Sequence, residues 1–348
     1  MKTELELKDV AVAYDGNTVI KEVSLSLQPG EIGCLLGPSG CGKTSLLRAI
    51  AGFEPVSHGE IHLNEQLVSQ PGNSVPTEQR RVGMVFQDFA LFPHLSVAKN
   101  VAFGLKKMDA GQRDARVNEL LQLVGLAHLK EAHPHQLSGG QQQRIALIRA
   151  MAPRPDILLM DEPFSSLDTE LREQLAREVR ELLKRDGITA ILVTHDQLEA
   201  FAMADVIGVV GEGRLHQWDS GYNIYHKPQS RFVADFIGQG VMLPGKVSEA
   251  LAIDTELGTI EGKLPLGCKP GCEIELLLRP DDVLHDDESE LKLEVKERAF
   301  RGAEYLYTLA LPSGQPILCL VQSHHHHRIG ERIGIRLDVE DIALFPAR

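Results

Sequence analysis

The stretch EIGCLLGPSGCGKT, residues 31–44, decides the fold of this chain. Its apolar first half, residues 31–36, leads into a glycine-rich loop that matches the pattern G-x-x-x-x-G-K-[ST]. A helix is predicted behind the loop, because Leu46, Leu47, Ile50 and Ala51 recur at helical spacing. Glycines let backbone N–H groups turn toward phosphate oxygens, and the helix N-terminus adds a favourable dipole. The stretch therefore predicts a strand, a loop and a helix that bind a nucleoside triphosphate through Gly37, Pro38, Ser39, Gly40, Cys41, Gly42, Lys43 and Thr44.

Strands and helices alternate on both sides of this loop. An alternating run at residues 4–12 predicts an opening strand, and further strands are predicted at residues 82–86, 157–161, 189–193 and 205–210. Helical patterns cover residues 140–151, 168–184 and 196–203. Alternation of this kind predicts an α/β fold with a largely parallel sheet.

The pattern changes near residue 240, after the flexible Gly238-Gln239-Gly240. Short alternating runs follow at residues 273–278, 291–295, 305–311, 317–321 and 333–337. Turn residues separate these runs, which is typical of a small all-β domain. The sequence thus predicts two domains, residues 1–239 and residues 240–348.

Composition excludes several classes of protein. Of the 348 residues, 43% are hydrophobic and 24% charged, as in a globular protein, and the net charge of -13 disfavours nucleic acid as a partner. No apolar run approaches the roughly 20 residues that span a bilayer, and the N-terminus lacks a secretory pattern. We therefore expect a cytoplasmic protein whose five cysteines, an odd number, are reduced.

Two carboxylates end the apolar run at residues 157–160. Asp161 is expected beside the phosphate loop, where it and Thr44 would hold Mg²⁺. Glu162 is placed to polarise a water molecule as a general base. An acidic helix cap is the simpler interpretation, which the neighbouring phosphate loop disfavours.

A second glycine-rich stretch precedes the predicted helix of residues 140–151. A serine and two glycines at a helix N-terminus favour a second anion site. In a head-to-tail homodimer, each nucleotide would lie between the Lys43 loop of one copy and this stretch of the other. An ordinary N-cap serine is the alternative. The predicted site consists of Ser138, Gly139, Gly140 and Gln141.

These stretches, in this order, resemble the ATPases of ABC transporters, over roughly residues 4–238. The resemblance implies a P-loop nucleotide-binding domain with a RecA-like core and a helical subdomain, which binds ATP and Mg²⁺. It also implies roles for further residues. Tyr14 would stack on adenine, Gln87 would contact the γ-phosphate and Mg²⁺, residues 165–168 match the D-loop, and His195 would be the switch histidine.

The resemblance also implies partners. The apolar loop of residues 88–96 would dock an integral-membrane permease, with a periplasmic solute-binding protein acting indirectly, and the subunit would be peripheral on the inner membrane's cytoplasmic face. Residues 277–282, LLRPDD, resemble the OB-like transport-associated domain of bacterial importers. The sequence as a whole resembles ferric-iron uptake ATPases best, with sugar, polyamine and sulfate importers as alternatives. A soluble ABC ATPase acting on ribosomes or DNA is disfavoured, because the chain has one cassette and no heptad insertion.

Four consecutive histidines, residues 324–327, remain outside this assignment. A histidine-rich loop is one way to bind iron or zinc. The simpler interpretation is a solvated turn, because no carboxylate or cysteine is expected nearby to complete a site.

Overall fold

The computed structural model describes residues 3–260, 264, 268–339 and 341–347. Its contacts divide the chain into two compact units, Met1–Gly221 and Tyr222–Arg348. The boundary predicted after residue 239 places helices α7 (Gly221–His226) and α8 (Arg231–Phe236) with the first domain. Within the second unit, the Arg279 guanidinium donates hydrogen bonds to the carbonyls of Tyr225 and Ala234.

A six-stranded sheet forms the centre of the first unit. The parallel strands β10, β3, β9, β8 and β7 are neighbours in that order, and β11 pairs antiparallel with β10 at the edge. Every residue of β3, β8, β9 and β10 is buried, as expected for strands covered on both faces. The predicted parallel sheet is confirmed, with strands β3 (Ile32–Leu36), β7 (Val82–Val85), β8 (Ile157–Asp161), β9 (Thr189–Thr194), β10 (Val206–Gly211) and β11 (Arg214–Asp219).

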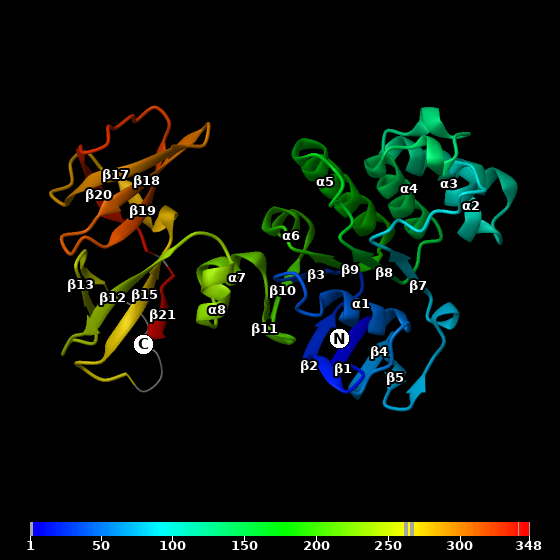
Figure 1. Cartoon of the computed structure of the whole chain (residues 1–348), viewed down its shortest axis with the longest axis horizontal. Helices are drawn as coiled ribbons and strands as arrows, with labels where there is room; N and C mark the ends of the chain where they lie inside the picture. Colours follow the sequence, from blue (N-terminus) through cyan, green and yellow to red (C-terminus); the bar gives the residue numbers. More distant parts are fainter. Residues whose placement is uncertain (1–2, 261–263, 265–267, 340, 348) are drawn as a thin grey trace. The chain divides into compact units, whose positions relative to one another are not determined.

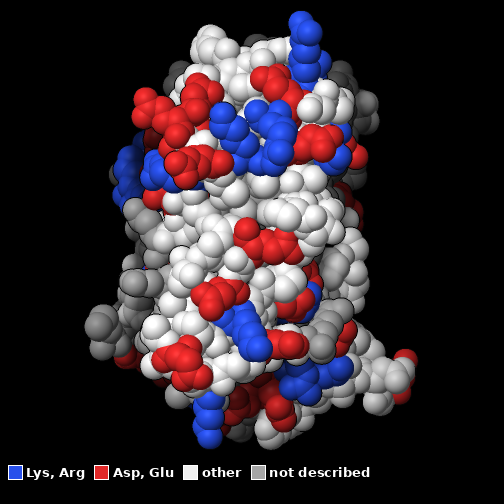
Figure 2. Space-filling view, turned by 90° about the vertical axis from the view of Figure 1, so that its left-hand side faces the viewer, with Lys and Arg blue, Asp and Glu red and all other residues white. Residues whose placement is uncertain are grey.

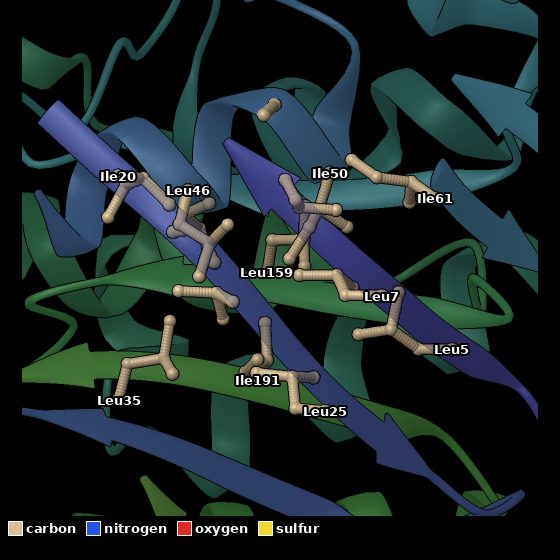
Figure 3. Packing of buried hydrophobic residues seen from close by; sticks show 14 of the residues in the cluster. Leu5, Leu7, Ile20, Leu25, Leu35, Leu46, Ile50, Ile61, Leu159 and Ile191 are labelled. Atoms are coloured by element: carbon tan, nitrogen blue, oxygen red, sulfur yellow. The ribbon is translucent and has the colours of Figure 1, made fainter. Parts of the chain in front are cut away.

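A second, antiparallel sheet lies in the same unit, and the sequence indicated only its first strand. Its order is β2-β1-β4-β5-β6. One buried cluster joins this sheet to helix α1 and to the parallel sheet, and it includes Leu7 of β1, Leu46 and Ile50 of α1, and Leu159 of β8 (Figure 3). The elements are β1 (Leu5–Tyr14), β2 (Asn17–Leu27), α1 (Lys43–Ala51), β4 (His58–Leu63), β5 (Gln66–Gln70) and β6 (Asn73–Ser74).

Helices occupy the chain between the parallel strands. Helices α2 (Val97–Ala102), α3 (Ala110–Leu123) and α4 (Gly139–Met151) connect β7 to β8 and gather in one part of the unit (Figure 1). Helix α5 (Thr169–Asp186) follows β8, and α6 (Gln197–Met203) follows β9. The three predicted helices at residues 140–151, 168–184 and 196–203 are confirmed as α4, α5 and α6.

The second unit contains two antiparallel sheets of five strands each, in the orders β14-β13-β12-β15-β21 and β16-β20-β17-β18-β19. Both contribute to one core, in which Tyr307 is the largest buried side chain. The predicted all-β, OB-like domain is confirmed. Its strands are β12 (Val241–Val247), β13 (Ile253–Thr255), β14 (Gly258–Ile260), β15 (Glu273–Leu278), β16 (Val283–His285), β17 (Lys292–Phe300), β18 (Glu304–Ala310), β19 (Pro316–Gln322), β20 (Arg332–Leu337) and β21 (Ala343–Pro346).

The surface carries charges of both signs. On the face drawn in Figure 2, basic and acidic side chains are intermingled and neither forms a continuous field. Within the described part of the chain, no helix combines the length and the hydropathy needed to cross a membrane. All five cysteines are free thiols in this structure.

Candidate functional site

The predicted site residues follow the carboxyl ends of four neighbouring parallel strands. The glycine-rich loop follows β3, His195 follows β9, Asp161 ends β8, and Gln87 comes shortly after β7. Because these strands are adjacent and parallel, their carboxyl ends share one edge of the sheet. Ligands of open α/β sheets bind at this edge.

The buried ammonium of Lys43 organises the loop. Its Nζ donates hydrogen bonds to the carbonyls of Gly37 and Pro38, both at 2.8 Å, and lies 3.6 Å from Cys41 Sγ. The ammonium is thus held in the concave side of the loop, with no carboxylate among these contacts. A cation in this position suits a bound anion.

The glycines of the loop are required for different reasons. A Cβ on Gly37 would meet the carbonyl oxygen of Val210 at 2.0 Å, so packing against β10 excludes a side chain. Gly40 faces open space, but its φ of +78° favours glycine. Gly42 combines both constraints, because its φ is +99° and a Cβ added there would lie 2.6 Å from the Ile20 side chain. Gly42 also precedes α1, and no side chain caps the N-terminus of this helix. The first N–H groups of α1 can therefore donate to a ligand.

Thr44 and Asp161 form the second part of the site. The Thr44 hydroxyl donates a hydrogen bond of 3.0 Å to Asp161 Oδ1. Burial raises the pKa of Asp161, and the Thr44 hydrogen bond opposes that rise. A buried carboxylate beside a hydroxyl offers hard oxygen ligands that a divalent cation would stabilise in the charged form.

Glu162 lies beside His195. The His195 Nδ1 atom is 3.2 Å from Glu162 Oε1, and the imidazole is more exposed than the carboxylate. The Glu162 backbone has a φ of +48°, which is unusual for a residue other than glycine. Its N–H donates to the Val193 carbonyl at 2.9 Å, which ties the residue to β9. The structure therefore brings the predicted base and the predicted switch histidine together.

A network behind His195 fixes the chain on either side of it. The Thr194 hydroxyl donates to Glu199 at 2.6 Å and accepts from the Asp196 N–H at 3.0 Å. Arg172 of α5 pairs with Asp196 at 2.9 Å. Burial raises the pKa of Glu199, and the Thr194 hydrogen bond opposes the rise. His195 thus projects from a rigid support.

The stretch Ser138–Gln141 forms the N-terminus of α4. Ser138 Oγ accepts from the Gln141 N–H at 3.3 Å, and Gln141 Oε1 accepts from the Ser138 N–H at 2.9 Å. This is a capping box, so both side chains bond within their own helix rather than to the Lys43 loop. Ser138 and Gly139 are exposed, while Gly140 packs against Leu167. The stretch is open on its outer side.

Gln143 is a site residue that the sequence analysis missed. Its side chain is buried and donates to the Glu162 carbonyl at 3.0 Å and to Ser165 Oγ at 3.4 Å. Its Oε1 accepts from the Ser166 N–H at 3.1 Å. The signal in the sequence is a polar residue on the buried face of α4. Gln143 connects the α4 stretch directly to the backbone of Glu162.

Tyr14 and Gln87 lie at the ends of their strands. Tyr14 ends β1 and shows 36% of its surface, which leaves its ring available for stacking. Gln87 opens the loop of residues 88–96, in which several apolar side chains are only partly buried. Arg149 of α4 holds this loop, because its guanidinium donates to the carbonyls of Ala90 and Phe89 at 2.7 and 3.1 Å.

Three of the four histidines of residues 324–327 are exposed, as in a solvated turn, but the loop also has polar neighbours. His327 Nδ1 lies 3.1 Å from Glu331 Oε1, and His325 approaches His285 and Asp287. The expectation that no carboxylate is nearby is therefore wrong, because the pairing of β16 with β20 brings Asp287 close to this loop.

Comparison with known proteins identifies relatives of both units. Residues 20–165 match the family described as ABC transporter, and residues 276–345 match the TOBE domain. Over 342 residues the chain is 40% identical to the "Fe(3+) ions import ATP-binding protein FbpC 2" of Pectobacterium atrosepticum, covering 96% of this chain and 97% of that protein.

Solved structures match the first part of the chain. The dimeric MJ0796 cassette, in a post-hydrolysis state with ADP and Pi, is similar with a TM-score of 0.57 and 32% identity, covering 62% of this chain and 98% of that one. CbiO1 of Clostridium perfringens, part of the ABC transporter complex cbiONQ, has a TM-score of 0.58 and 29% identity, covering 64% and 91%.

Proposed function

The chain belongs to the ABC transporter family of ATP-binding proteins, and from this premise we propose that it is the ATP-hydrolysing subunit of an importer for ferric iron. One observation carries the proposal: the identity of 40% to a ferric-ion import ATP-binding protein extends over nearly the full length of both chains. The match therefore includes the C-terminal unit and is not limited to the nucleotide-binding unit.

ATP would bind at the carboxyl edge of the parallel sheet. The β- and γ-phosphates would lie in the loop before α1, where they replace the Gly37 and Pro38 carbonyls as partners of the Lys43 ammonium. The uncapped N–H groups of α1 would donate to phosphate oxygens. Tyr14 is exposed at the end of β1 and would stack on the adenine ring.

Thr44 and Asp161 suit Mg²⁺, because both offer oxygen ligands and the Asp161 carboxylate is buried. Gln87 would contribute a further oxygen from the loop after β7. When bound, the ion would neutralise charge on the β- and γ-phosphates. The Asp161 carboxylate would then bind the cation in place of its hydrogen bond from the Thr44 hydroxyl.

Glu162 is the proposed general base. Its carboxylate would accept a proton from water while the water oxygen attacks the γ-phosphorus, which gives ADP and phosphate. His195 touches this carboxylate at 3.2 Å and would also reach the γ-phosphate, so its ring links the base to the nucleotide. The bonds from Glu162 N–H to Val193 and from Gln143 to the Glu162 carbonyl hold the base in place.

The arrangement of Ser138–Gln141 supports a head-to-tail dimer. Ser138 and Gly139 are exposed at the N-terminus of α4, while the capping bonds close on their own helix. In the proposed closed state Ser138 and Gly140 would contact the γ-phosphate held by the second copy. The dimeric state of the MJ0796 cassette supports this arrangement.

Residues 88–96 are the proposed docking surface for the membrane permease. Their apolar side chains are only partly buried, and Arg149 connects their backbone to α4. Loss of the γ-phosphate contact to Gln87 would therefore be transmitted to this loop. We place the subunit on the cytoplasmic face of the inner membrane, with a periplasmic solute-binding protein delivering the solute to the permease.

Uptake of radiolabelled ferric iron tests the proposal. Cells that lack the native subunit would receive the wild-type chain, the Glu162→Gln variant or Glu170→Gln, which changes an exposed acidic residue of the same unit. We expect uptake with the wild type and with Glu170→Gln, and none with Glu162→Gln. Uptake of maltose, spermidine or sulfate in place of iron would reject the solute, and wild-type uptake by Glu162→Gln would reject the base.

A further inference from the structure

A cluster of histidines lies in the second unit, on elements that the proposed ATPase chemistry does not use. His285 ends β16, Asp287 follows it, and His325 and His327 belong to the loop between β19 and β20. Tyr307 anchors this loop, because its hydroxyl accepts from the His327 N–H at 3.0 Å and donates to the His325 carbonyl at 3.3 Å. The fold thus holds residues from two distant segments against each other.

Three of these side chains can share one ion. The potential ligand atoms of His285, Asp287 and His325 all lie within 4.8 Å of one another. The ring centroids of His285 and His325 are 5.1 Å apart, and those of His285 and His327 are 4.7 Å apart. His327 therefore lies beside the three as a candidate fourth ligand.

Two imidazole nitrogens in the cluster are buried without a hydrogen-bond partner. The His285 side chain is only 8% exposed, and its Nε2 lies 3.1 Å from Asp287 Oδ1 without the geometry of a hydrogen bond. His327 Nε2 is likewise buried and unpartnered. Buried polar atoms are normally satisfied, and an ion that accepts the lone pairs of both nitrogens would satisfy them.

The second ring nitrogen of His327 supports the same conclusion. His327 Nδ1 lies 3.1 Å from Glu331 Oε1, so a carboxylate can fix the ring with Nε2 free. Histidines that bind metals usually donate their other N–H to such a carboxylate.

We propose that His285, Asp287 and His325, with His327 beside them, form a binding site for a divalent transition metal of the zinc class. Imidazole nitrogens with one carboxylate suit zinc and its neighbours, whereas Mg²⁺ and Ca²⁺ prefer oxygen ligands alone. The metal would connect the end of β16 to the loop before β20. None of its residues belongs to the proposed nucleotide site.

Titration of the full chain with Zn²⁺ tests the proposal. The protein would be prepared without a polyhistidine tag, treated with a chelator and followed by isothermal titration calorimetry. We expect one equivalent to bind tightly to the wild type, and this binding to be lost in His325→Ala and Asp287→Asn. These side chains are exposed, so the variants should melt at the wild-type temperature when free of metal.

Matched variants separate this site from other histidines and thiols. His324→Ala removes an exposed histidine of the same loop that lies outside the group, and it should bind as the wild type does. The double variant Cys268→Ser with Cys272→Ser should also bind normally, although those thiols lie 3.3 Å apart. Glu331→Gln should weaken binding about 10–100-fold, as is typical of residues that orient a ligand.

Several results would overturn the site. Unchanged Zn²⁺ binding in both His325→Ala and Asp287→Asn would exclude these ligands. Equal losses in His325→Ala and His324→Ala would indicate non-specific binding by the histidine run. Loss of the tight equivalent in the cysteine double variant would place the metal on the thiols.

Discussion

Replacement of Gln143 tests whether α4 positions the proposed base. Gln143→Leu removes three hydrogen bonds, to the Glu162 carbonyl, to Ser165 Oγ and from the Ser166 N–H. At a net value of about 1 kcal/mol each, the three bonds stabilise the fold by about 3 kcal/mol. Because Ser165 and Ser166 are exposed and can bond to water, we expect a net loss of about 1–2 kcal/mol.

The effect on catalysis should exceed what this loss of stability explains. The Glu162 carbonyl would lose the bond from Gln143 and keep those from the Ser165 N–H and hydroxyl, while the Lys43 loop would be untouched. We expect kcat to fall about tenfold, equivalent to about 1.4 kcal/mol of transition-state stabilisation. The KM for ATP should change by less than about twofold, since ground-state binding is unaffected.

The assay is steady-state ATP hydrolysis at varied ATP, with thermal unfolding in parallel. Gln143→Glu retains an acceptor for the Ser166 N–H but loses both donated bonds, so it should lower kcat at least as much as Gln143→Leu. Gln174→Leu, at an exposed position on α5, is the control. If Gln143→Leu unfolds earlier yet keeps the wild-type kcat, the residue is only structural and the positioning role is refuted.

Further predictions concern a thiol, an arginine and a buried carboxyl. Cys41 lies 3.6 Å from the Lys43 ammonium, so alkylation should abolish hydrolysis and ATP should protect; full activity after a mass-confirmed adduct would contradict this. Arg279 is buried and donates hydrogen bonds to the carbonyls of three residues. Arg279→Lys should therefore lower the free energy of unfolding of the second unit by about 2–3 kcal/mol, measured by calorimetry, with Arg332→Lys at an exposed position as the control. Burial raises the pKa of Asp282 from 3.8 to about 6, so the folded state binds its proton more tightly and the group's stabilising contribution is lost as pH rises through this interval. Asp282→Asn should therefore become more stable relative to the wild type as the pH rises from about 4 to about 6. A difference in unfolding free energy between the two proteins that stays constant over this pH range would exclude the effect.

The sequence predicted the parallel sheet because most of its strands are short, fully apolar runs. The motif residues that follow β3, β8 and β9 could be placed for the same reason, since the carboxyl ends of parallel strands share an edge. The antiparallel sheet was harder to predict. Its β4 strand, HGEIHL, mixes polar and apolar residues, and its pairing with β1 depends on contacts far apart in the chain.

Partners from distant segments account for what the sequence did not predict. Gln143 looked like one polar residue of a helix, and only the folded chain shows the Glu162 carbonyl that it reaches. His285 and His325 are separated by the whole of β17, β18 and β19, so their proximity depends on how β16 pairs with β20. An ordinary N-cap serine was the alternative for Ser138, and the cap that it forms with Gln141 coexists with an exposed outer surface.

The glycines before α1 constrain the evolutionary history of this loop. The Val210 carbonyl leaves no room for a side chain at position 37. Position 40 has room, and only its positive φ favours glycine, a conformation that asparagine also tolerates. A duplicated gene whose product had lost its nucleotide would therefore still retain Gly37, while Gly40 could drift to asparagine. Retention of the first glycine in such a pseudoenzyme would reflect sheet packing, and an intact Gly40 would be the better sign of selection for phosphate.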